Sequence, residues 1–276
     1  MTTTVSVSAG EAPQSSTRVE RVIWGKSYTD AVVNELHRLS TKRAFLVVSK
    51  SLNSDTDLVV RLEQALGQYF VGKKVGIRPH TPWEDIIELT KEIQSAKADV
   101  IITLGGGSIT DAAKVALLAV ANEVNTPDDL NTLVFDEQSV DTVLPPNIQL
   151  ICIPTSLSGG EYNSGSGATD SRVGAKRIFR HPLCVPKSII LDPVITLHTP
   201  DWLWLYTGMR SVDHCVETLS SLNSNSESDD LAAIALKKLT GSLLQTNHNR
   251  QDISSRLQSL LGVWEATQAS VMKEVD

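Results

Sequence analysis

Three consecutive glycines form the clearest candidate for a ligand-binding loop. Gly105, Gly106 and Gly107 directly follow the apolar run 100–104, and Ser108 comes next. Glycines let the backbone approach a pyrophosphate closely, and the free N–H groups at a helix start bind anions. The loop is neither a GxGxxG fingerprint, because position 110 is Thr, nor a Walker A loop. On spacing alone, a phosphate-binding loop and a tight structural turn therefore both remain open.

The residues after the glycines indicate where the next helix begins. Ser108 and Asp111 have the spacing of a capping box, in which side chains bond the backbone at a helix start. The apolar pattern that follows predicts a helix over 110–121. The glycine loop would then join a strand to this helix.

A second loop, residues 154–161, follows another apolar run. It carries the hydroxyl residues Thr155, Ser156 and Ser158 and a pair of glycines. Taken alone, this loop is better explained as a surface turn. Two such loops at strand ends of one sheet favour a nucleotide, because ligands of parallel sheets bind at the carboxyl ends of the strands.

The elements that would position these loops alternate along the chain. Apolar runs predict strands at 19–24, 44–48, 75–78, 100–104, 148–153 and 188–191. Amphipathic stretches between them predict helices at 30–39, 58–66, 83–93 and 110–121. Largely apolar strands separated by helices indicate an α/β fold with a parallel sheet covered on both faces. The polar stretch 122–146 is expected to be a loop.

After residue 192 the strand signals stop, and 200–221, 228–246 and 252–274 are all typical of helices. The sequence thus predicts an α/β domain over 18–196 and an all-helical domain over 197–276, after a disordered tail over 1–17. Apolar faces are expected on the last two helices, formed by Leu236, Leu239 and Leu243 and by Ile253, Leu257, Leu260, Leu261, Trp264 and Val271. Because they exceed what these helices can bury, we expect a homo-oligomer or a partner chain.

The bulk composition excludes several classes of partner. The 276 residues carry a net charge of -7, so there is no broad basic field for nucleic acid or an anionic membrane. Three separated cysteines favour a reduced, intracellular protein. With no long apolar stretch and no signal peptide, the sequence predicts a cytoplasmic location.

Four segments occur in the order found in the iron-type alcohol dehydrogenase family, which the chain resembles over about residues 20–222. They are GGGSITDAAK, PTSLSGGEYNSGSGATD, KRIFRHPLCVPKSIILDP and GMRSVDHCVETL. The stretch 78–84 resembles the maleylacetate-reductase branch, in which a His, here His80, replaces the Asn common in other members. The ordered set is far more specific than any single segment.

The resemblance implies an NAD or NADP cofactor between a dinucleotide-binding domain and a helical domain. Gly105, Gly106, Gly107 and Ser108 would hold the pyrophosphate, and Asp111 belongs to the same motif. Thr155, Ser156 and Ser158 would lie along the cofactor, and Lys176 would reach its ribose. Ser49 stands where NAD-selective members have an Asp that repels a 2′-phosphate, so the choice between NAD and NADP stays open.

The metal site that the resemblance implies is incomplete. Members that bind iron or zinc use an Asp and a His one helical turn apart, followed by two later His residues. His214 matches the first His, but Arg210 occupies the Asp position, and its charge would oppose a metal ion. The later His motif would fall beyond Asp276, so the helical domain is expected to be incomplete too.

Both residues also have interpretations that need no metal. His214 is the candidate for polarising or protonating a carbonyl oxygen, or it is a helix histidine bonded to a neighbour. Arg210 either pairs with a nearby carboxylate such as Asp213 or clamps a substrate carboxylate.

The sequence therefore predicts an NAD(P)-dependent oxidoreductase acting on a small alcohol or carbonyl substrate, in a biosynthetic or aromatic-degradation pathway. The alternative is a truncated, non-catalytic homologue that binds a nucleotide or a partner chain. Cofactor titration with a turnover assay separates the two.

Overall fold

A computed structural model of the protein describes residues 19–136 and 142–273, so the tail predicted over 1–17 lies outside the described residues. Six parallel strands form one sheet in the order β1-β8-β5-β4-β2-β3. They are β1 (Arg21–Trp24), β2 (Ala44–Val48), β3 (Phe70–Val75), β4 (Val100–Gly105), β5 (Gln149–Pro154) and β8 (Ser188–Leu191). The predicted α/β class and parallel sheet are confirmed.

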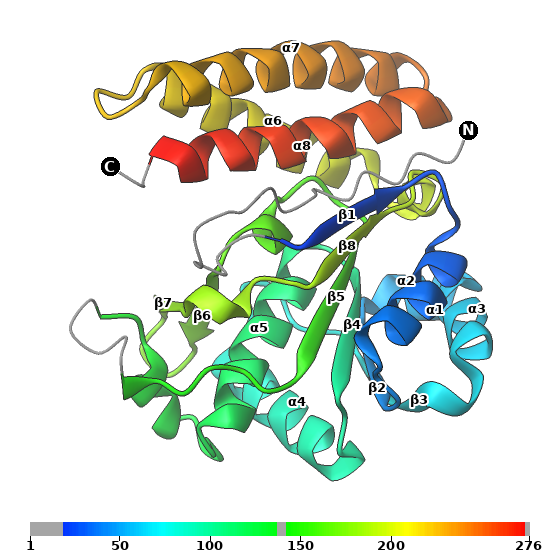
Figure 1. Ribbon diagram of the computed structural model, residues 1–276, viewed down its shortest axis with the longest axis vertical. Coiled ribbons are helices and arrows are strands. Elements are labelled where there is room, and N and C mark those ends of the chain that lie inside the picture. Colours follow the sequence, from blue (N-terminus) through cyan, green and yellow to red (C-terminus); the bar gives the residue numbers. More distant parts are fainter. Residues whose placement is uncertain (1–18, 137–141, 274–276) are drawn as a thin grey trace.

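Helices cover both faces of this sheet (Figure 1). They are α1 (Tyr28–Leu39), α2 (Lys50–Asp55), α3 (Leu58–Leu66), α4 (Trp83–Ala96) and α5 (Gly107–Ala121). Successive strand residues point to opposite faces, so Ile101 packs in the core with α4 and α5, whereas Ile102 packs with α1 and α3. Burial on both faces is why these strands appear in the sequence as continuous apolar runs.

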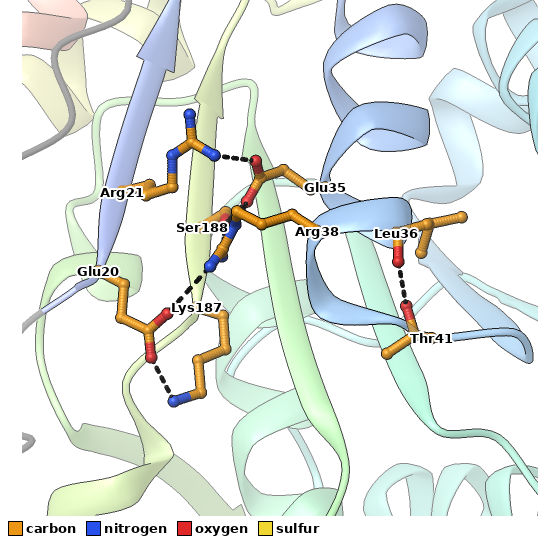
Figure 2. A network of polar contacts seen from close by, with 8 residues as sticks. All are labelled: Glu20, Arg21, Glu35, Leu36, Arg38, Thr41, Lys187 and Ser188. Carbon is orange, nitrogen blue, oxygen red and sulfur yellow. Dashed lines mark hydrogen bonds and ion pairs between the residues drawn. The ribbon is translucent and has the colours of Figure 1, made fainter.

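The carboxylate of Glu35 ties α1 to the edge of the sheet (Figure 2). Its side chain is buried, and it accepts hydrogen bonds from Arg21 Nη1 at 2.8 Å and Arg38 Nε at 2.7 Å. The hydroxyl of Ser188, in β8, also donates to it. A buried charge is tolerated only when it is paired and hydrogen-bonded, and these three donors satisfy that condition.

Three further helices form a layer at one end of the sheet domain (Figure 1). They are α6 (Asp201–Leu219), α7 (Ser226–His248) and α8 (Ile253–Lys273). The face predicted for α8 is partly confirmed, because Leu260 is fully buried and Leu261 and Trp264 pack half-buried against the core. The most buried face of the helix also includes Arg256, Ser259, Val263, Ala266 and Ala269. Small residues on this face let α7 and α8 approach so closely that a Cβ on Gly262 would lie 2.8 Å from Leu239.

Four local predictions need correction. The third strand is β3 at Phe70–Val75, not 75–78, because this edge strand carries Gly72 and two lysines rather than an apolar run. The short helix α2 was not predicted. Neither was an antiparallel hairpin of β6 (Gly165–Asp170) and β7 (Ala175–Arg180), because β6 consists of small and polar residues. Within the expected loop 122–146, a 3₁₀ helix at Asp129–Leu133 buries two leucines.

Candidate cofactor-binding site

The glycine loop and the 154–161 loop lie face to face at the carboxyl edge of the sheet. The N–H of Thr155 donates to the carbonyl of Gly105 at 3.0 Å. A Cβ on Gly106 would lie 3.1 Å from Ser156 Oγ, and one on Gly107 would lie 3.0 Å from Ser158 Oγ. The glycines therefore serve close packing between the loops, a role that the sequence did not indicate.

Ser49 belongs to the same edge, at the end of β2. Its N–H donates to the carbonyl of Leu104 at 3.0 Å, and a Cβ on Gly105 would lie 3.3 Å from Ser49 Cβ. The predicted residues that follow β2, β4 and β5 are thus neighbours in space, although they are separated by about a hundred positions in the chain.

Helix α5 begins earlier than the sequence predicts, and the capping box is wrong. The helix starts at Gly107 with Gly106 as its N-cap and no side-chain cap, so Ser108 and Asp111 are inside the helix. The N–H groups of Gly107 and Ser108 donate no hydrogen bond to any residue in the described part of the chain. These free donors, at the positive end of the helix dipole, fit the phosphates of a dinucleotide.

A cavity of about 340 Å³ adjoins these loops and brings four of the predicted residues together. Asp111 of α5, Ser158 of the second loop, Lys176 of β7 and His214 of α6 all line it. The far wall is formed by α8, through residues such as Thr267. Gly105 to Ser108, Ser49, Thr155 and Ser156 lie at the sheet edge beside the cavity rather than in its lining.

Lys176 reaches the cavity by lying across β6. A Cβ on Gly167 would come within 2.2 Å of Lys176 Cε, so any side chain at this position would force the lysine to move. The sequence signal for this arrangement is the Gly-Ser-Gly stretch of 165–167, which is explained only when the hairpin is known.

Sequence reasoning missed Lys114, which is buried under the second loop. Its ammonium donates to the carbonyls of Gly160 and Asn163, both at 2.5 Å, and of Gly165 at 3.1 Å. Burial lowers the pKa of Lys114, and the nearby Asp111 opposes that shift. Burial also raises the pKa of Asp111, and it raises the pKa of Glu161 to about 7.

His214 and Arg210 make different contacts on α6. His214 Nδ1 lies 3.1 Å from a carboxylate oxygen of Glu217, and His214 lines the cavity. Arg210 is not in the cavity lining, and it donates to Asp213. Over residues 19–136 and 142–273, no three His, Cys, Asp or Glu side chains come together as a metal-binding group. This donor set does not fit a divalent metal ion.

The relatives of this chain are oxidoreductases. Dehydrogenase ALT3 of Alternaria alternata is 38% identical over 82% of the chain and 63% of its own length. The crystal structure of maleylacetate reductase from Agrobacterium tumefaciens matches 92% of the chain and 63% of that structure, with 24% identity and a TM-score of 0.74. The chain thus spans less than two thirds of the length of these relatives.

The fold is shared more widely. Sulfoacetaldehyde reductase from Bifidobacterium kashiwanohense, solved in complex with NAD+, matches 92% of the chain and 65% of that structure, with 19% identity and a TM-score of 0.81. The family model for iron-containing alcohol dehydrogenases matches residues 20–193, which include the whole parallel sheet and both loops. The chain therefore belongs to the iron-containing alcohol dehydrogenase family.

Proposed function

We propose that the protein is an NAD(P)-dependent oxidoreductase that acts on a small alcohol or carbonyl compound. The observation that carries the proposal is the free N–H pair of Gly107 and Ser108 beside a cavity lined by Lys176. Helix N-termini bind phosphates, and the lysine adds a second cationic contact. The NAD+ complex of sulfoacetaldehyde reductase, which shares this fold, is in line with such a ligand.

In this proposal the chain holds and orients the cofactor, and the bound nicotinamide supplies hydride chemistry. Gly107 and Ser108 would bond the pyrophosphate, Thr155, Ser156 and Ser158 would lie along the cofactor, and Lys176 would bond its ribose. Ser49 places no carboxylate at the end of β2, so we propose that both NAD and NADP are accepted.

His214 is the proposed proton donor to the carbonyl oxygen of the substrate. His214 lines the cavity, and the contact with Glu217 fixes the orientation of the imidazole. Arg210 stays paired with Asp213 and has no assigned contact with the substrate.

A titration with NADH and NADPH, followed by a turnover assay on short aldehydes, tests the proposal. We expect saturable binding of both cofactors, with dissociation constants in the micromolar range, and oxidation of NAD(P)H that depends on the aldehyde. Failure of both cofactors to bind would overturn it.

The second candidate is a non-catalytic nucleotide-binding protein with a partner chain. It is favoured by an exposed apolar face on α6, where Trp202, Tyr206 and Met209 are 69%, 74% and 57% exposed. Such a patch is typical of an interface. Cofactor binding without any turnover would support this candidate over the enzyme.

A further inference from the structure

Strand β7 presents a cation, an apolar residue and a second cation to the cavity. Lys176, Ile178 and Arg180 alternate along the strand, so all three point to one face, and all three line the cavity. Ile178 is 47% exposed, so its side chain is available to a ligand in the cavity. Arg177 and Phe179 point to the opposite face.

Arg180 is held in place by an aromatic ring. Its guanidinium lies over Phe135, with 5.2 Å from Cζ to the ring centroid, and the N–H of Phe135 donates to the carbonyl of Ile178 at 2.8 Å. Gly165 stands opposite Arg180 in the hairpin, and a Cβ there would lie 3.7 Å from Arg180 Nε. The guanidinium is thus oriented by its neighbours while its N–H donors are left accessible.

No carboxylate among residues 19–136 and 142–273 forms an ion pair with Arg180. Arg172, at the turn of the same hairpin, shows the ordinary arrangement, because it pairs with both Asp128 and Asp170. The described residues that line the cavity also include Lys176 and His214, and the one acid among them is Asp111, whose charged form is disfavoured by burial. The cavity is therefore suited to an anion.

Lys176 and Arg180 lie at opposite ends of the strand. Four residues along a strand span roughly 13 Å. Lys176 lies nearer the glycine loops, on the side of Asp111, whereas Arg180 is at the far end of the strand. If Lys176 contacts the cofactor, Arg180 is left for a different anion.

We propose that Arg180 binds a carboxylate of the substrate, so that the cavity selects carbonyl compounds that carry one, with Ile178 covering their apolar carbons. The planar guanidinium matches a carboxylate through two parallel hydrogen bonds. This inference rests on the proposed oxidoreductase function for the reaction, but the binding of the carboxylate itself can be tested without turnover.

The test uses two four-carbon aldehydes that differ in the carboxylate, succinic semialdehyde and butanal. Arg180→Gln should lower kcat/KM for succinic semialdehyde about 10- to 100-fold, chiefly through KM, because a charged hydrogen-bonded pair contributes about 1.5–3 kcal/mol. Activity with butanal and the Kd of the cofactor should stay within about twofold. Arg177→Gln, which removes the same charge from the opposite face of β7, should change none of these.

Equal losses with both aldehydes, or weaker cofactor binding in Arg180→Gln, would overturn the inference. If the protein shows no turnover at all, an NMR titration with succinate decides instead. Succinate binding that is lost in Arg180→Gln and kept in Arg177→Gln would support the carboxylate site while the proposed oxidoreductase function fails. Identical titrations of the wild type and Arg180→Gln would reject the site.

Discussion

The ammonium of Lys114 lies 2.5 Å from the carbonyl oxygen of Gly160. This contact joins the middle of α5 to the loop that follows β5, and the carbonyls of Asn163 and of Gly165, the first residue of β6, share the ammonium. One buried cation thus fixes the backbone beside the glycine loop. The position of this loop therefore depends on Lys114, the last residue of the GGGSITDAAK motif.

We expect Lys114→Met to destabilise the protein and to loosen this loop. The three carbonyls would lose a charged donor, which should lower the free energy of unfolding by about 3 kcal/mol, measured by urea denaturation. Hydrogen exchange of residues 159–165 should increase as well. Lys91→Met, at an exposed position of α4, is the control, and equal effects of the two changes would contradict this role.

Replacing Gly106 with Val should abolish cofactor binding while the protein stays folded. A Cβ at this position would already lie 3.1 Å from Ser156 Oγ, so the larger side chain must push the two loops apart. Calorimetry with NADH and NADPH measures the loss. Gly241→Val, where a Cβ meets nothing within 4 Å, is the matched control and should bind as the wild type does. Unchanged binding by Gly106→Val would count against the site.

The stability of the protein should depend on pH through Glu161. Burial raises the pKa of its carboxyl from 4.5 to about 7, so the folded state holds this proton more tightly than the unfolded state. The contribution of Glu161 therefore favours folding at low pH and is lost as pH rises from about 4.5 to about 7.

Glu161→Gln should accordingly be more stable than the wild type at pH 8, by at most about 3 kcal/mol, and no more stable at pH 4. Urea denaturation at several pH values measures the difference. Glu123→Gln, at an exposed position, should show no such trend. A pH-independent difference between Glu161→Gln and the wild type would show that the carboxyl does not titrate in this range.

Divalent metal binding should be weak or absent in this chain. Arg210 stands one turn from His214, and the described residues supply no third donor nearby. Metal analysis of protein purified without chelator should show far less than one ion per chain. Arg210→Asp should raise the affinity only slightly. A stoichiometric content of iron or zinc would refute this prediction.

The protein should self-associate or bind a partner through α6. Apolar surface was expected on α7 and α8, but Leu239 of α7 and Leu260 of α8 are buried between helices, whereas Trp202 and Tyr206 of α6 are exposed. Light scattering over a dilution series should detect the association, and Tyr206→Lys should weaken it. A wild type that stays monomeric at high concentration and binds no hydrophobic dye would disprove this.

The sequence by itself determined the parallel sheet and the two loops at its edge. Val100 to Leu104 and the run before Pro154 are buried on both faces, and such strands leave a continuous apolar signal. The ordered motifs around Gly105 and Thr155 likewise predicted the family. The match of residues 20–193 to the family model confirms that prediction. These features are local, so they can be recognised without knowing which distant segments meet.

Only the tertiary structure decided how the cavity is built. The hairpin of β6 and β7 has no apolar alternation, so nothing local indicated that Lys176 and Arg180 point the same way. Lys114 donates to carbonyls that lie 46 to 51 residues away in the chain. The space for a side chain at Gly106 is limited by the hydroxyl of Ser156, not by residues next to Gly106 in the sequence. Contacts of this kind depend on how the loops pack after the sheet has formed, and that packing leaves no periodic signal in the sequence.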